Sequence, residues 1–315
     1  MPSLRAEKRA FFAFAMIELV VAISILVILV SLVLVGVQSA REHARRMQCQ
    51  NNIRQIIIGL NNIWERHGTI PHLFAKQIVP DGGIERSFSV NPFVPIAEEL
   101  SIAFKAVNRG LHLDDNYFDE SYPPPVLTCP SSGIRLGYRL NFGMAPTRGR
   151  GLPNPEPLFA VGGFKQTRLV QVTDGLSNTV AIAERIPSDS EYFPRAIVQT
   201  TQANSFAEMP SFCNFSTGVV MPRQDWWVPL LEECGYEHSV SPNHRNVDCI
   251  CVLSPSTRDV KFRWQIAARS FHSGVVTVAK MDSSIQAITS SIDLKTWQSL
   301  GTHHGNEVIN ALEVE

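Results

Sequence analysis

The hydrophobic pattern begins with an almost unbroken apolar segment over residues 11–37, in which Glu18 is the one charged residue. A hydrocarbon core about 30 Å thick needs about 20 helical residues to cross it, so this segment is long enough to span a membrane. The apolar part of a secretory signal peptide has only about 7–15 residues. The pattern therefore predicts a membrane anchor in preference to a cleaved signal sequence.

Residues 38–66 continue with an amphipathic pattern, in which apolar residues recur at three- and four-residue spacings along one helical face. These apolar positions are Ala40, Ala44, Met47, Ile53, Ile56, Ile57, Leu60, Ile63 and Trp64. No proline lies between Pro2 and Pro71, and Gly68 is placed to end a helix. We therefore expect one helix over residues 14–66, about 80 Å long at 1.5 Å per residue. Its first half would span the membrane, and its second half would pack on a globular head.

The remainder, residues 67–315, forms the expected head and is dominated by short β-strand signals. The clearest signals lie at residues 180–183, 249–253, 275–281 and 284–288. The last two flank Asp282 and Ser283 as a hairpin, and Asp293 can cap a short helix that Gly301 ends. These elements predict an α+β fold, with a long N-terminal helix packed on a mainly antiparallel β-sheet.

The composition gives no reason to expect nucleic acid as a partner, because the net charge is −1 and only 18% of residues are charged. The chain contains no phosphate-binding loop, dinucleotide fingerprint or H-E-x-x-H motif. Ser177 lies in a Gly-x-Ser sequence that lacks the second glycine of a nucleophile elbow. We therefore expect a protein that is not an enzyme and has no cofactor.

The start of the apolar segment, residues 14–18 (Phe-Ala-Met-Ile-Glu), resembles the cleavage and methylation segment of type IV pilins and of type II secretion pseudopilins. The resemblance implies that a prepilin peptidase removes a basic leader, residues 1–13, and that Phe14 is then methylated. It departs from the family at Ala13, where glycine is usual. A carboxylate in an apolar span costs at least about 2.5 kcal/mol. Glu18 would offset that cost by pairing with the amine of a neighbouring subunit during assembly.

Further motifs, in the same order along the chain, resemble a large family of prepilin-type proteins in planctomycete bacteria called domain of unknown function 1559. These motifs lie at residues 40–56, 129–131, 174–179, 184, 272–274, 282, 292–297 and 300–302. Ser283 stands where the family usually has glycine. The resemblance implies a pilin-like surface protein but no particular activity.

Charge counting leaves the membrane orientation open, because basic residues flank both ends of the apolar segment. They are Arg5, Lys8 and Arg9 on one side and Arg41, Arg45 and Arg46 on the other. The pilin resemblance favours a single pass through the inner membrane, with the N-terminus in the cytoplasm and the head in the periplasm or at the cell surface. The partners it implies are the membrane, a prepilin peptidase and other pilin-like subunits.

A head outside the cytoplasm can keep disulfides. The candidates are Cys129, Cys213, Cys234, Cys249 and Cys251. Five cysteines cannot all pair with one another, so one would bond Cys49 or another chain, or stay reduced. Cys249 and Cys251 would lie on the same face of one strand. A metal site at Cys234, His238, His244, Cys249 and Cys251 is one alternative, and unpaired buried thiols are another. The spacing of these residues matches no paired C-x2-C motif, and we expect no metal. His303 and His304 are expected in an exposed loop.

Two functions fit these features. The first is a pilin- or pseudopilin-like subunit that assembles through the helix over residues 14–66. The second is a membrane-tethered binding module, in which the head captures a glycan, a surface polymer or a protein and the helix is only an anchor.

We predict that the mature chain begins at Phe14 and carries an N-methyl group, because the register of Phe14 and Glu18 matches the pilin pattern. Mass spectrometry of the N-terminal peptide from membranes with an active prepilin peptidase checks this prediction. Ala13→Gly should speed cleavage. An intact leader on the wild-type chain in those membranes would contradict it.

Overall fold

The computed structural model describes residues 16–70, 75–81, 84–101, 123–131, 136–143, 147–148, 158–159, 166–186, 197–200, 218–219, 234–245, 248–253 and 261–305. Ala13, Phe14 and Cys213 lie outside these ranges. The chain divides into two compact units, residues 1–45 and residues 46–315.

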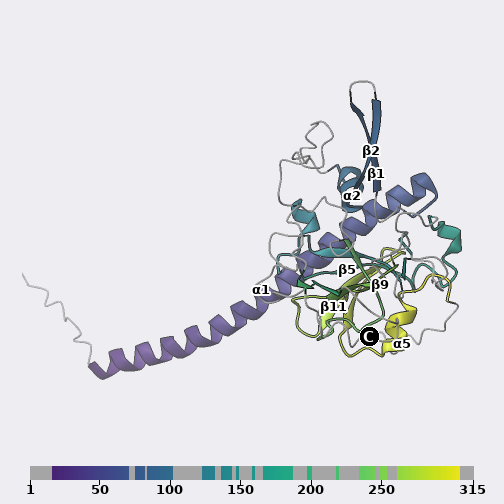
Figure 1. Ribbon diagram of the computed structural model, residues 1–315. Coiled ribbons are helices and arrows are strands. Elements are labelled where there is room, and N and C mark those ends of the chain that lie inside the picture. Colours follow the sequence, from purple (N-terminus) through teal and green to yellow (C-terminus); the bar gives the residue numbers. More distant parts are fainter. Residues whose placement is uncertain are drawn as a thin grey trace, which may run out of the picture. The chain divides into compact units, whose positions relative to one another are not determined.

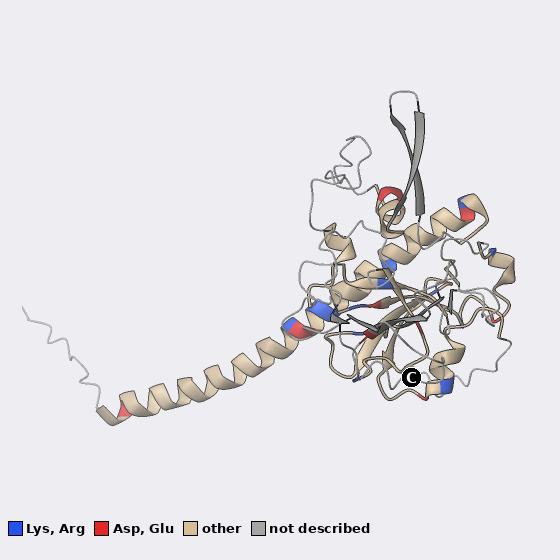
Figure 2. Ribbon diagram, in the orientation of Figure 1, with Lys and Arg blue, Asp and Glu red and all other residues tan. Residues whose placement is uncertain are grey.

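The long helix α1 runs over Met16–His67, so the predicted continuous helix is confirmed for its described part. Its N-terminal half is long and apolar enough to cross a membrane, and it is exposed throughout the most apolar window. Glu18 is the only acidic or basic residue of α1 before Arg41. Figure 2 accordingly shows a long stretch of this helix without charge. Gly68 ends the helix as predicted: it has a φ of +68°, and its N–H donates to the Trp64 carbonyl at 2.7 Å.

The second half of α1 supplies one face to the core of the head. Its buried residues are Cys49, Asn52, Ile53, Ile56, Ile57, Gly59, Leu60 and Trp64. The predicted face is therefore correct from Ile53 onward. It is wrong at Ala40, Ala44 and Met47, which are exposed, because the part of α1 that belongs to the head core begins only at Cys49.

The main sheet of the head has the order β12-β11-β5-β3-β8. Figure 1 labels two of its strands, β11 and β5. Its strands are β3 (Tyr138–Asn141), β5 (Val180–Glu184), β8 (Gly235–Tyr236), β11 (Val275–Lys280) and β12 (Ile285–Thr289). All neighbouring strands are antiparallel except β3 and β8, which are parallel. Every residue of β3 and β5 is buried, so both faces of these central strands are covered. The predicted hairpin around Asp282 is β11 and β12, and the predicted α+β fold is confirmed.

A second sheet has the order β4-β10-β9-β6-β7, and a separate hairpin pairs β1 with β2. The second sheet consists of β4 (Thr147–Arg148), β6 (Ile197–Thr200), β7 (Gly218–Val219), β9 (Asp248–Leu253) and β10 (Lys261–Gln265). The hairpin consists of β1 (Ala75–Asp81) and β2 (Ile84–Val90). Cys249 and Cys251 both lie on β9, as expected.

Short helices connect these parts. They are α2 (Phe93–Glu99), η1 (Pro125–Leu127), η2 (Leu169–Gln171) and α5 (Leu294–Ser299). Asp293 caps α5 as predicted, because its carboxylate accepts hydrogen bonds from the backbone N–H groups of Lys295 and Thr296. Trp297 of α5 is fully buried and stacks on the His238 ring with centroids 4.0 Å apart.

We predict that Gly301→Ala destabilises the head by about 1–3 kcal/mol through overpacking. A Cβ atom at Gly301 would lie 2.4 Å from Cγ and 2.6 Å from Cβ of the buried His238. Those atoms are close to the backbone and cannot swing away. Chemical unfolding followed by tryptophan fluorescence measures the change.

Gly36→Ala is the matched control, because no atom lies within 4 Å of the added carbon. Equal unfolding midpoints for Gly301→Ala and Gly36→Ala would contradict the predicted clash.

Candidate functional site

Several charged side chains are buried in the head. They are Arg139, Glu184, Arg185, Glu237, Asp248 and Arg269. An ionised group removed from water is costly unless it is paired and hydrogen-bonded. Their partners therefore show how this part of the head is organised.

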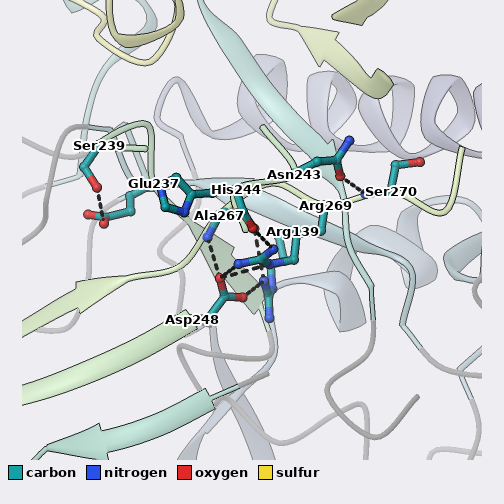
Figure 3. Close-up of polar contacts among 9 residues, drawn as sticks. All are labelled: Arg139, Glu237, Ser239, Asn243, His244, Asp248, Ala267, Arg269 and Ser270. Atoms are coloured by element: carbon teal, nitrogen blue, oxygen red, sulfur yellow. Dashed lines mark hydrogen bonds and ion pairs between the residues drawn. The ribbon is translucent and has the colours of Figure 1, made fainter. Parts of the chain in front are cut away.

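Asp248, the first residue of β9, joins two arginines from different parts of the head (Figure 3). Its Oδ2 accepts from Nη1 of Arg139, on β3, at 3.2 Å. Its Oδ1 accepts from Nη2 and Nε of Arg269, at 2.8 and 3.1 Å, and from the backbone N–H of Ala267 at 3.0 Å. Because β3 and β9 belong to different sheets, this carboxylate ties the two sheets together.

Arg269 also forms part of a surface pocket of about 310 Å³. The pocket is lined by Ile186, Asn243, Arg269, Ser270, Phe271, His272, Ser273, Gly274 and Ser290. A second pocket of about 560 Å³ is lined by Ser241, Pro242, Asn243, His244, Arg245, Ser290 and Ser291. Arg269 is held in place from behind, since its Nη1 donates to the His244 carbonyl in addition to its bonds to Asp248.

The two pockets share Asn243 and Ser290. The Asn243 side chain donates to Ser290 Oγ at 2.9 Å. It also accepts from the Ser270 N–H at 2.8 Å (Figure 3), and the two bonds orient this shared wall. The described lining is rich in hydroxyl and basic groups and contains no acidic residue. Such a lining can bind hydroxylated or anionic groups.

A disulfide joins Cys49 of α1 to Cys129, which follows η1. It realises one of the alternatives that the sequence left open, pairing a head cysteine with the helix cysteine. Next to it, the Asn52 side chain donates to the Thr128 carbonyl at 2.7 Å, and the Tyr138 hydroxyl donates to the Cys49 carbonyl at 3.1 Å. The disulfide and the Asn52 hydrogen bond thus hold the helix to the segment around Cys129, and the Tyr138 hydrogen bond ties the helix to β3.

The other candidate cysteines are less informative. Cys234 is completely buried. Cys249 and Cys251 are placed as backbone positions of β9, paired with Gln265 and Arg263 of β10.

His272 and Glu184 lie beside the disulfide. His272 Nε2 is 3.9 Å from Cys129 Sγ and 3.5 Å from Glu184 Oε1, and both side chains are buried. The other carboxylate oxygen of Glu184, Oε2, accepts from the Thr277 N–H at 2.9 Å. Burial raises the pKa of Glu184, and hydrogen bonds from neighbouring groups, with the His272 charge, oppose that rise.

His238 is unsuited to the alternative metal site predicted from the cysteine and histidine spacing. Its Nδ1 lies 2.7 Å from the Trp297 carbonyl and its Nε2 lies 3.0 Å from the Tyr236 hydroxyl. Burial lowers the pKa of His238 to about 3, so the ring is neutral at physiological pH. Nδ1 must donate to the carbonyl, and Nε2 therefore accepts from Tyr236. Neither nitrogen has a lone pair left for a metal.

The expectation that His303 is exposed is wrong. Its side chain is buried, and its carbonyl accepts from the N–H groups of Thr173 and Asp174. Burial, together with the neighbouring His304 charge, lowers the pKa of His303 to about 4. His304 is exposed, as expected.

The structure contains two polar clusters that the sequence did not predict: Glu184 with His272, and Asp248 with Arg139 and Arg269. The structure places Glu184 beside His272, although the two residues are far apart in the sequence. For the Asp248 cluster, the sequence signal was a charged residue within or next to a short apolar strand, as at Arg139 and Asp248. That signal marks a buried charge but does not name its partner.

We predict that Asp248→Asn destabilises the head by about 3–5 kcal/mol, because it leaves two buried guanidinium groups without their shared carboxylate. Urea unfolding at neutral pH measures the loss. Asp282→Asn is the control: Asp282 is exposed and its Oδ1 accepts from Ser284, so the change should stay within about 0.5 kcal/mol. Similar losses for both variants would show that the network does not carry this stability.

Comparison with known proteins identifies the family. No curated protein and no solved structure gave a significant match. A family model described as "Protein of unknown function (DUF1559)" matches residues 38–295, which is most of the chain and includes the second half of α1, both polar clusters and the disulfide. The chain belongs to the DUF1559 family.

Proposed function

We propose that this protein is a non-enzymatic, pilin- or pseudopilin-like subunit of a cell-surface or type II secretion-like assembly. The observation that carries the proposal is the division of α1 into two halves with different surroundings. The first half is apolar, exposed and nearly free of charge, whereas the second half is part of the head core. A simple tether would not require one helix to serve both purposes.

In this proposal the exposed half of α1 first crosses the inner membrane and then packs against the same half of other subunits. A prepilin peptidase removes the leader and exposes the amine of Phe14. That amine, on a neighbouring subunit, neutralises Glu18 in the packed helices. The pairing provides a favourable partner for a carboxylate that is otherwise costly in an apolar setting.

The Cys49–Cys129 disulfide supports a head outside the cytoplasm, because disulfides persist in oxidising compartments. It also bonds the second half of α1 covalently to the segment that follows η1. The bridge closes a long loop, because its two cysteines are 80 positions apart in the sequence. In the chain-entropy model a disulfide that closes a loop of this length stabilises the fold by about 4.5 kcal/mol.

The second candidate function is a membrane-tethered binding module. The two adjoining pockets around Asn243 and Ser290 favour it, because their hydroxyl and basic lining suits a glycan or a surface polymer. The two functions predict different behaviour of α1. Assembly requires contacts between the apolar halves of different copies, whereas a tether works as a monomer.

We predict that Glu18→Leu leaves the protein inserted in the membrane but reduces its incorporation into assemblies, because the partner of the neighbouring amine is lost. A pull-down of tagged wild-type subunits with co-expressed variant measures incorporation. Ser31→Leu is the matched control: it makes the same helix more apolar without removing a charge. Incorporation of Glu18→Leu at the wild-type level would contradict the pairing.

A further inference from the structure

We propose that Cys49, Cys129, Glu184 and His272 form a binding site for a divalent metal ion of the zinc type when the Cys49–Cys129 disulfide is reduced. The head would then be closed at this point either by a disulfide or by a metal ion. The proposal does not depend on whether the protein assembles into a filament.

The geometry supports a single ion. One ligand atom from each of these four residues lies within 4.8 Å of every other, and all four residues are buried. In a tetrahedral site with zinc–sulfur distances of about 2.3 Å, two sulfurs lie about 3.8 Å apart. Sγ of Cys49 and Sγ of Cys129 are bonded in the oxidised chain. Once that bond is broken, rotation of the two side chains can bring the sulfurs to the separation that zinc requires.

The ligands come from separate, well-packed parts of the head. Cys49 lies on α1, Glu184 ends β5, and Cys129 and His272 flank structured elements, η1 and β11 respectively. A site built on such elements keeps its ligands close without the metal. The four ligand residues therefore stay close together when the disulfide is broken.

The carboxylate of Glu184 provides the independent sign of a ligand. Its Oε2 is held by the Thr277 N–H, whereas its Oε1 is buried and its nearest charged neighbour, the His272 ring, lies beyond ordinary hydrogen-bond length. Oε1 faces His272 Nε2 at 3.5 Å, beside the disulfide. A buried carboxylate oxygen without a hydrogen bond raises the free energy of the folded state. A metal ion would satisfy it, with the Thr277 bond orienting the carboxylate from behind.

The chemistry balances with a dithiol as reductant. The dithiol gives two electrons and two protons to the Cys49–Cys129 bond, which becomes two thiols, while the dithiol becomes a disulfide. The incoming ion then displaces one proton from each thiol and binds two thiolates, one carboxylate oxygen and one imidazole nitrogen. All four positions are filled by protein, which is typical of structural sites and leaves no open position for catalysis.

The test compares the oxidised and reduced forms of the full chain in detergent. A phosphine reductant is used because it adds no competing thiols. Each form is equilibrated with Zn²⁺ and desalted, and zinc and free thiols are counted per chain. We expect the reduced form to retain one more zinc ion than the oxidised form.

Variants separate this site from the remaining cysteines. Cys49→Ser should abolish the extra ion, and Glu184→Gln and His272→Gln should each weaken zinc affinity by about tenfold or more. Cys234→Ser, a matched change of another buried cysteine, should keep the extra ion. Substitution with Co²⁺ in the wild-type chain should give the absorption of tetrahedral thiolate coordination, a readout that needs no variant to fold.

Two results would overturn the proposal. One is a reduced wild-type chain that keeps its circular dichroism spectrum but retains no more zinc than the oxidised chain. The other is unchanged zinc affinity in Glu184→Gln and His272→Gln, which would assign the ion to cysteines alone.

Discussion

One face of α1 packs into the core of the head through four aliphatic side chains. They are Ile53, Ile56, Ile57 and Leu60, and each is completely buried. Burial of an aliphatic side chain of this size is worth roughly 1.5–3 kcal/mol. The Cys49–Cys129 bond and the hydrogen bond from Asn52 then hold the helix in register with the segment around η1. Both candidate functions of the apolar half of α1 depend on this attachment, because the same helix connects that half to the head.

Polar contacts play a different part from the apolar core. Asp248 couples β3 and β9, which belong to separate sheets, and it holds Arg269 at the wall of the pocket. Glu184 is held by Thr277 beside His272 and the disulfide. Buried charges of this kind add little net stability compared with apolar residues of the same size. Their effect is to define which atoms face the pocket and which face the disulfide.

Local signals in the sequence predicted many elements correctly, and each has a local physical cause. Gly68 ends α1 because glycine readily adopts a positive φ, and Asp293 caps α5 because its carboxylate reaches the next N–H groups in the chain. The β11–β12 hairpin needs only two short apolar strands and the turn between them. The predictions failed where exposure depended on distant parts of the chain, as at Met47 and His303.

The long helix with its apolar first half, the α+β class, the family and the short elements near the C-terminus could all be predicted from the order of residues alone. Periodicity and turn chemistry act over a few residues, so they can be read without knowing the fold. The three-dimensional fold was needed to show that Cys49 bonds Cys129, that Glu184 faces His272 and that Asp248 binds two arginines. The residues of each pair are far apart in the sequence. Strand order and register bring them together, and the residues next to either one in the chain do not indicate its partner.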